Sequence, residues 1–291
     1  MKEKIYEEFN IKVKYLLYRK ENISFFHDDQ NYLICETDKE NNDLIKLNEI
    51  VLYLENYGLY FHKLIEGKNG ILFTYDNKKY VLMQTRMCYN RSITIAEIIN
   101  LSRVPLKNEI FINPGIKLAT KIDFIEQFLA NYTKNITIDL AYYIGLCENA
   151  VTLYNLLEEK YFNKSFNHKR VYKDMKIIEF YNPLNIVVDY QTRDIAEYAK
   201  SLYFTENRNI FFECLNLFDQ KEWITYFARL LYPSYYFDAF ETSLTSKNDQ
   251  EIKKISSKAN SYEIILKNLY SELKKYINIP NIEWLNNIDN F

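Results

Sequence analysis

The segment from Phe166 to Lys200 constrains the fold of this chain more than any other stretch. It reads FNHKRVYKDMKIIEFYNPLNIVVDYQTRDIAEYAK. A loop led by His168 is followed by short apolar runs, an acidic turn at Asp189 and a helical pattern that opens on Asp194. Because loops held on such rigid elements carry binding and catalytic side chains, the residues of this loop decide which chemistry is available.

Composition is typical of a soluble globular protein. With 291 residues, 48% hydrophobic and 26% charged, the chain can form one large domain or two joined lobes. A net charge of -2 argues against a dedicated nucleic-acid binder, which needs a basic face. The start, MKEKIYEEFN, has no apolar core of a signal peptide, and no apolar run approaches the ~20 residues that span a bilayer. We therefore expect synthesis in the cytoplasm.

The cysteines do not predict a metal site. Cys35, Cys88, Cys147 and Cys214 lie far apart without a CxxC pair, and the three histidines are also scattered. We expect buried, reduced thiols.

Tyrosine is abundant, with 27 residues against 5 glycines. An AT-rich genome, which favours Tyr, Asn, Lys and Ile codons, explains much of this excess. The alternative is an adhesive, tyrosine-rich surface, which would require exposed tyrosines.

The first third of the chain predicts short strands around one helix. Asp43–Tyr57 has apolar residues at helical spacing and ends at Gly58, a residue suited to a helix C-terminus. Asp76 and Asn77 predict a tight turn. The runs expected as strands are Ile11–Tyr18, Ile23–His27, Tyr32–Cys35, Tyr60–Ile65, Ile71–Tyr75 and Tyr80–Gln84.

The rest is expected to be mainly helical, and the lobe boundary is expected near Thr85–Ser92, which divides the chain into 1–88 and 89–291. Strands, a helix, more strands and then helices predict an α+β, bilobal, protein-kinase-like fold with a small antiparallel-sheet lobe and a larger helical lobe. The expected helices are Lys117–Tyr132, Ile138–Leu157, Gln191–Phe204, Ile210–Phe218, Glu222–Leu231 and Glu251–Tyr276.

A phosphotransferase of this shape needs a glycine-containing turn and a strand lysine paired with a helix glutamate. The first hairpin, Arg19–Asn22, reads RKEN, and the first glycine of the chain is Gly58. The third strand places Cys35 or its neighbours where the lysine should be. Without that lysine, Glu49 is expected to be a solvated helix residue.

The catalytic loop is also altered. In aminoglycoside-phosphotransferase-like kinases it reads His-Gly-Asp, with an Asn five residues after the Asp. Here it reads His168-Lys169-Arg170, and the fifth residue after Arg170 is Met175. Arg170 is a permanent cation that cannot act as a base, and the Met175 thioether is a poor Mg²⁺ ligand. Asp174 would be the alternative ligand if the loop slipped by one residue.

Two aspartates remain as candidate site residues, Asp189 and Asp194. Asp189 follows an apolar strand where a metal-binding Asp would stand, but a turn or helix-cap carboxylate is the simpler interpretation. Asp194 is expected to hold the loop backbone through buried hydrogen bonds, with His168 in the same network.

Five motifs of the chain stand out together by their order and spacing. They are GKNGILFTYDNKKYVLM (Gly67–Met83), YIGLCENAV (Tyr143–Val151), HKRVYKD (His168–Asp174), NPLNIVVDYQTRDIAEY (Asn182–Tyr198) and ARLLYPSYYFDAFE (Ala228–Glu241). In this order and spacing they resemble YutH-type spore-coat proteins of endospore-forming Firmicutes, a group in the CotS-like branch of the aminoglycoside-phosphotransferase/choline-kinase fold. The resemblance covers about residues 5–245, and the tail after Lys247 matches least well.

The resemblance implies a kinase-like fold, association with other spore-coat proteins and no required enzymatic activity. It assigns positional roles only: His168 and Arg170 lie in the catalytic loop, Met175 at its metal-ligand position, Asp189 at the metal-binding Asp and Asp194 at the loop anchor. We expect a catalytically impaired kinase-like protein of the spore coat that needs no cofactor. The alternatives are an active, divergent small-molecule phosphotransferase using ATP and Mg²⁺, with Asp189 and Asp174 as ligands, and a non-catalytic ligand-binding module that uses the interlobe cleft.

Overall fold

The chain folds into two compact units in a computed structural model. One unit comprises residues 1–93 and 174–186, and the other comprises residues 94–173 and 187–291. The structure describes residues 1–18, 22–86, 91–106, 114–131, 138–158, 161–246 and 248–286. The expected division at residue 88 stays a prediction, since residues 87–90 lie outside this described part.

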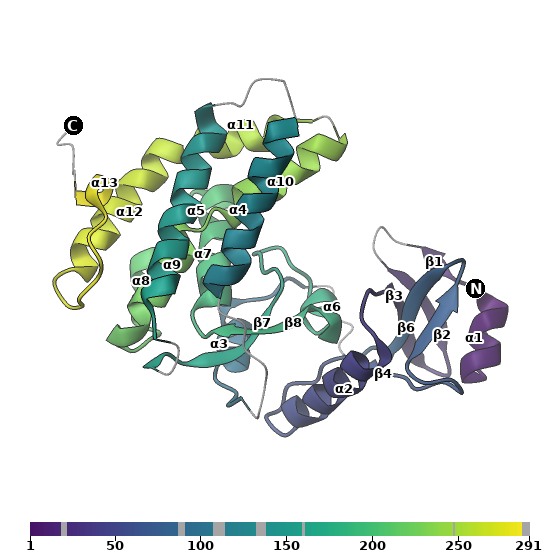
Figure 1. Cartoon of the computed structure of the whole chain (residues 1–291). Coiled ribbons are helices and arrows are strands. Elements are labelled where there is room, and N and C mark those ends of the chain that lie inside the picture. The colour runs from purple at the N-terminus through teal and green to yellow at the C-terminus, as the bar shows by residue number, and fades with distance from the viewer. Residues whose placement is uncertain are drawn as a thin grey trace. The chain divides into compact units, whose positions relative to one another are not determined.

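The first unit is built on an antiparallel sheet (Figure 1). Its strand order is β1-β2-β3-β6-β4, and β5 also pairs with β6. Both residues of the Asp28-Asp29 and Asp76-Asn77 turns have positive φ, which is the geometry of tight hairpins whose twist matches that of the strands. The strands are β1 (Leu17–Tyr18), β2 (Ile23–His27), β3 (Gln30–Glu36), β4 (Lys63–Leu64), β5 (Leu72–Tyr75) and β6 (Lys78–Gln84).

The longest helix described in this first unit is α2 (Asn41–Glu55). In α2, Leu44, Leu47, Val51 and Leu54 form the buried face, as their spacing predicts. Gly58 follows with a φ of 75°, a conformation that glycine adopts without strain.

The N-terminal segment differs from its prediction. Lys2–Phe9 forms the helix α1, and only Leu17–Tyr18 of the expected strand Ile11–Tyr18 is a strand. The fully buried Ile5 joins a cluster with Phe25, Ile34 and Leu82, and Figure 1 shows α1 beside the sheet. One deeply buried apolar residue in a charged stretch gives little helical periodicity, so the helix depends on packing.

Residues 174–186 belong to this first unit. They contain the short helix α6 (Ile177–Phe180) and the 3₁₀ turn η2 (Pro183–Asn185). His62 holds them in place, because its backbone N–H donates to the Tyr181 carbonyl at 2.9 Å and its Nε2 lies 2.7 Å from the Ile178 carbonyl oxygen. Burial lowers the pKa of His62 to about 4.

The second unit is mainly helical (Figure 1). The helix α9 contacts both α5 and α7, and β7 pairs with β8 in a two-stranded sheet. The elements are α3 (Ile95–Ser102), α4 (Pro114–Asn131), α5 (Ile138–Leu156), β7 (Lys164–His168), β8 (Ile186–Tyr190), α7 (Arg193–Glu206), α8 (Phe211–Leu215), η3 (Gln220–Glu222), α9 (Trp223–Leu231), α10 (Ser234–Ser246), α11 (Gln250–Ser256), α12 (Ala259–Leu273) and α13 (Glu283–Asn286).

The helical predictions for this unit need correction. The helices α3, α10 and α13 were not predicted, and the single helix expected over Glu251–Tyr276 is two helices, α11 and α12. The break falls at Lys258, whose ammonium donates to the backbone carbonyls of Tyr203 and Phe204 at 3.2 and 2.8 Å. The break between α11 and α12 therefore lies where Lys258 contacts the last turn of α7. The spacing of apolar residues in the sequence does not indicate this break.

Tyrosines contribute both to the core and to the surface. They are prominent among the largest fully buried side chains, at positions 143, 154, 190, 226, 236, 262 and 270. Other tyrosines are exposed, at positions 6, 15, 18, 57, 60, 75, 161, 172 and 276. Much of the tyrosine excess thus fills the helical lobe. No helix in the described ranges is long and apolar enough to cross a membrane.

Candidate functional site

A buried aspartate anchors the His168 loop within the second unit. The Asp194 carboxylate, at the start of α7, accepts hydrogen bonds from the His168 backbone N–H at 2.9 and 3.1 Å. The His168 ring also contributes, since its Nδ1 lies 2.8 Å from Asp194 Oδ2, and both side chains are buried. Charge-assisted bonds of this kind are stronger than neutral ones, so the end of β7 is fixed to α7.

Asn167 ties the same strand to β8. Its Nδ2 donates to the carbonyl oxygens of Asp189 and Tyr190 at 3.2 and 3.3 Å, and its Oδ1 accepts from the Asp194 N–H at 3.3 Å. The side chain is fully buried. Asn167 was not among the residues predicted from the sequence. The signal that the sequence offered was an asparagine directly before the loop histidine, because an amide side chain at such a place can bond to neighbouring backbone groups.

Asp189 is engaged by a guanidinium. Its Oδ2 accepts from Arg193 Nη1, and its Oδ1 accepts from the Tyr190 N–H at 2.8 Å. Arg193 Nη2 also donates to the Lys169 carbonyl at 3.0 Å, so one arginine connects the carboxylate to the loop backbone. The Asp189 side chain is only 4% exposed. Arg193 was not among the predicted site residues.

Arg170, which the sequence analysis predicts at the position of the catalytic base, is exposed and forms an ion pair with Asp238 of α10, with Nη2 and Oδ1 separated by 2.8 Å. Burial raises the pKa of the Asp238 carboxyl, against the opposing effect of Arg170. In the same lobe, Lys121 of α4 pairs with Glu241 of α10. The positive charge of Arg170 in the loop is therefore balanced by the Asp238 carboxylate.

Met175 and Asp174 lie in the other unit. Met175 is a buried core residue whose carbonyl accepts from the Ile93 N–H at 2.9 Å, and Asp174 is exposed. The residue predicted at the metal-ligand position of the loop is thus a thioether packed in a core.

Cys35 occupies a buried position on β3. Its Sγ donates to Asn22 Oδ1 at 2.8 Å, and burial raises the pKa of the thiol to about 12. Glu49 of α2 is solvent-exposed. Residues 19–21 of the first hairpin and Cys88 lie outside the described residues, whereas Cys147 and Cys214 are buried free thiols, as expected.

A buried charge cluster that the sequence analysis did not foresee joins α7, α9 and the start of α10. Glu197 accepts from Lys200 Nζ at 2.9 Å and from Arg229 Nε at 2.6 Å. Lys200 also donates to the carbonyls of Arg229 and Tyr232 at 3.0 and 2.7 Å. All the donors of this ammonium are used, so the cluster braces the helices.

The charged groups of this cluster shift one another's pKa values. Burial by itself raises the pKa of Glu197, but the neighbouring Lys200 and Arg229 cations lower it to about 2. Burial lowers the pKa of Lys200 to about 8, against the attraction of Glu197.

The loop residues do not fit a catalytic Mg²⁺. Both carboxylate oxygens of Asp189 are taken by protein donors, and Arg193 supplies the positive charge that the metal would bring. In the described part of the chain, no three His, Cys, Asp or Glu side chains are grouped so that they could hold a metal ion.

Comparisons with known proteins identify a family and a fold. A family model described as "Spore coat putative kinase YutH" matches residues 123–274. The match includes Asp189, Arg193 and Asp194, and it extends past Lys247 into the tail where the weakest resemblance was expected. No curated protein sequence is significantly similar to the chain.

Solved structures share the whole fold at low sequence identity. An aminoglycoside phosphotransferase from Alicyclobacillus acidocaldarius is 10% identical, with a TM-score of 0.55 over 90% of this chain and 93% of that chain. A thermostable mutant of aminoglycoside phosphotransferase APH(4)-Ia is 9% identical, with a TM-score of 0.57 over 94% and 99%. The chain thus has the bilobal aminoglycoside-phosphotransferase-like fold that the sequence predicts.

Proposed function

Since the chain belongs to the spore coat YutH family, we propose that it is a catalytically impaired kinase-like protein with a structural or assembly role in the bacterial endospore coat. It is made in the cytoplasm and contacts other coat proteins. The kinase-like lobes serve as a scaffold, and neither ATP nor Mg²⁺ is required.

The Asp189–Arg193 pair carries this proposal. In a phosphotransferase of this fold, the corresponding carboxylate must be available to a metal ion that neutralises phosphate charge. Here the guanidinium is tethered to the chain four residues away, and a metal would have to displace it from a carboxylate that is 4% exposed. A fixed internal cation stabilises the loop and removes a ligand at the same time.

Arg170 and Cys35 also support impaired catalysis. Arg170 cannot remove a proton from an acceptor hydroxyl, and its charge is compensated by Asp238. Cys35 replaces a strand lysine with a buried, neutral thiol. Losing the base, the lysine and the metal ligands together removes most of the electrostatic stabilisation of a phosphoryl-transfer transition state. The groups that brace the loop, His168 and Asp194, remain.

The test is complementation in a spore-forming bacterium that lacks its own family member. The variant is Asp189→Asn/Arg193→Gln, which replaces both charged partners by amides and leaves no unpaired charge. We expect this variant to enter the coat and restore coat assembly as well as the unmodified protein does. Absence of the unmodified protein from the coat, or a folded double variant that fails to restore the coat, would refute the proposal.

A further inference from the structure

The strand β1 forms an open edge of the sheet in the first unit. Among the described strands, β1 is outermost in the order β1-β2-β3-β6-β4. It pairs with β2 on its inner side, through Leu17 with Ser24 and Tyr18 with Ile23. An edge strand presents unpaired backbone N–H and C=O groups along its outer side, and these groups can bind a further strand.

Exposed apolar side chains flank this edge on both faces of the sheet. Leu17 pairs with Ser24, so it shares a face with Phe26, which lies two residues further along β2. Tyr18, the residue after Leu17, lies on the opposite face. Leu17, Tyr18 and Phe26 are 58%, 70% and 59% exposed. An added strand has side chains on both of its faces, so it can contact all three residues at once.

The segment that leads into β1 sets the charge of the partner. Residues 10–18 include Lys12 and Lys14 and no acidic residue, and both lysines are exposed. Lys2 brings a third positive charge to this segment, because its ammonium donates to the Lys14 carbonyl at 2.6 Å. Within the described part of the chain, no ion pair joins Lys12 or Lys14 to an acidic side chain. These lysines repel the same edge of a second copy and attract carboxylates.

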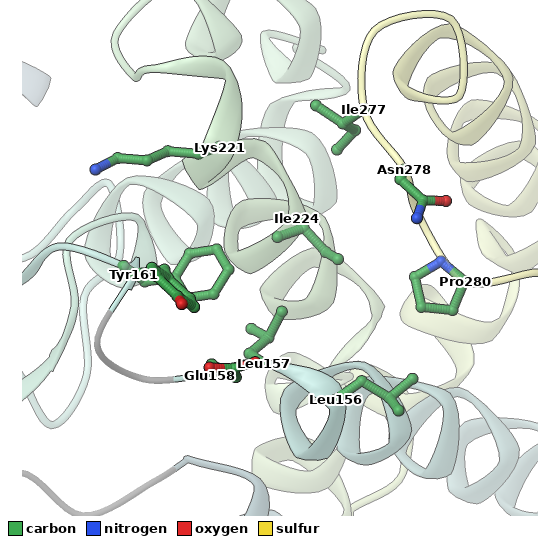
Figure 2. Close-up of a pocket in the computed structure, with 10 residues that line it drawn as sticks. Leu156, Leu157, Glu158, Tyr161, Lys221, Ile224, Ile277, Asn278 and Pro280 are labelled. Atoms are coloured by element: carbon green, nitrogen blue, oxygen red, sulfur yellow. The ribbon is translucent and has the colours of Figure 1, made fainter.

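The second unit contains a pocket of about 730 Å³ whose lining is chemically mixed (Figure 2). Figure 2 shows Glu158 beside Leu157 and Asn278 beside Pro280. The Lys221 ammonium points away from the other lining residues. This lining combines both signs of charge with apolar walls, so it does not select one class of ligand. The edge at β1 combines one sign of charge with apolar side chains, and it therefore specifies its partner more narrowly.

We propose that β1 accepts an extended acidic segment of another protein as an additional antiparallel strand. Carboxylates of that segment lie at Lys12 and Lys14, and its apolar side chains pack against Leu17, Tyr18 and Phe26. Backbone hydrogen bonds supply affinity, and the lysines select acidic segments over basic ones. A membrane fits this edge less well, because the open backbone groups would meet hydrocarbon without hydrogen-bond partners. The inference rests on the proposed assembly role and names the class of partner.

The test is fluorescence anisotropy of a labelled peptide titrated with the full chain. The peptide has about nine residues, in which valine and threonine alternate and two glutamates stand near the carboxyl end. In antiparallel pairing that end lies opposite Lys12 and Lys14. We expect saturable binding that weakens at high salt. The same peptide with lysines in place of the glutamates should bind at least tenfold more weakly. A peptide N-methylated at alternate residues, which cannot donate the ladder hydrogen bonds, should not bind.

Three variants of the protein separate the contributions of charge and apolar contact. Lys12→Gln/Lys14→Gln should weaken peptide binding about fivefold, because each lysine forms a solvent-exposed ion pair with the peptide. The matched control is Lys253→Gln/Lys254→Gln, which removes two exposed lysines of α11 and should leave the affinity unchanged. Leu17→Thr keeps a residue suited to strands but removes apolar contact, and it should weaken binding about threefold. Unchanged melting temperatures show that the variants are folded.

Absence of saturable binding, equal affinity for the acidic and basic peptides, or undiminished binding of the N-methylated peptide would overturn the inference. Equal effects of the two double-lysine variants, or binding to anionic phospholipid vesicles without binding to the acidic peptide, would overturn it as well. The outcome is distinct from that of coat complementation. A protein that restores the coat without binding the peptide refutes only strand addition at β1, and a protein that binds the peptide but is absent from the coat refutes only the proposed function.

Discussion

Asp189 and Arg193 form a buried ion pair that links the end of β8 to the first residue of α7. The pair places a permanent positive charge at the carboxylate that we propose to correspond to the metal-binding one of a phosphotransferase of this fold. The same arginine bonds the Lys169 carbonyl, so the loop is braced by a side chain of the protein itself.

Breaking this pair should be costly. We predict that Arg193→Gln lowers the free energy of unfolding by about 3 kcal/mol, because it leaves the Asp189 carboxylate buried without its partner. Asp189→Asn/Arg193→Gln should be more stable than Arg193→Gln alone, since no buried charge remains unpaired. Urea denaturation measures both effects.

The matched control is the Asp249–Lys253 pair, which has the same spacing of four residues but side chains that are 62% and 74% exposed. Lys253→Gln should cost no more than about 0.5 kcal/mol. Equal costs for Arg193→Gln and Lys253→Gln would show that the buried pair does not brace the loop.

Asp194 should be equally important for stability. We predict that Asp194→Asn lowers the free energy of unfolding by about 2 kcal/mol, because the amide cannot supply the charged acceptor that binds the His168 N–H and ring. Asp238→Asn is the control, since Asp238 pairs with the exposed Arg170 and should cost less than about 1 kcal/mol. A smaller loss for Asp194→Asn than for Asp238→Asn would contradict the anchoring role.

Glu197 should make stability fall in acid. Its pKa in the folded state is about 2, below the ordinary 4.5, so its stabilising charge is fully present above 4.5 and is lost as pH falls toward 2. Glu197→Gln lacks this titration. The stability difference between the wild type and Glu197→Gln should therefore shrink by about 3 kcal/mol across this range, measured by urea denaturation at successive pH values. A pH-independent difference would contradict the assignment.

Buried tyrosines should make stability fall in alkali. Burial raises the pKa of Tyr226, Tyr235 and Tyr262 well above 10.0, so these phenols stay protonated in the folded state while the unfolded chain ionises. Stability is then lost as pH rises above 10. Lys200 acts in the opposite direction between pH 8 and 10.5, but it is one group.

Tyrosinate absorbance and far-UV circular dichroism, followed together in a pH titration, check this expectation. The phenols of the core should ionise in one cooperative step that coincides with loss of helical signal. Their gradual ionisation in a protein that keeps its circular dichroism would contradict their burial.

The sequence predicted the architecture because the architecture depends on local patterns. The spacing of Leu44, Leu47, Val51 and Leu54 fixes α2, and the Asp-Asn pair at 76–77 fixes a hairpin. α1 escaped prediction because Ile5 is one buried apolar residue in a charged segment. The break between α11 and α12 coincides with contacts of Lys258 to α7, which no local rule contains.

The candidate site was predictable in part for the same reason. His168, Asp189 and Asp194 stand at the ends of recognisable runs, so their places could be inferred from order along the chain. Arg193 was missed because the four-residue spacing rule applies within helices, whereas Asp189 ends a strand. The Glu197–Arg229 contact joins residues on two different helices and depends on how those helices pack.

We propose that this kinase-like protein does not use Mg-ATP, and a thermal-shift titration of the full chain with Mg-ATP tests this proposal. A ligand that binds the folded state raises the melting temperature by mass action. We predict no shift up to millimolar Mg-ATP. Saturable stabilisation by several degrees, lost in Asp189→Asn/Arg193→Gln, would contradict the account and show that Asp189 still serves a nucleotide site.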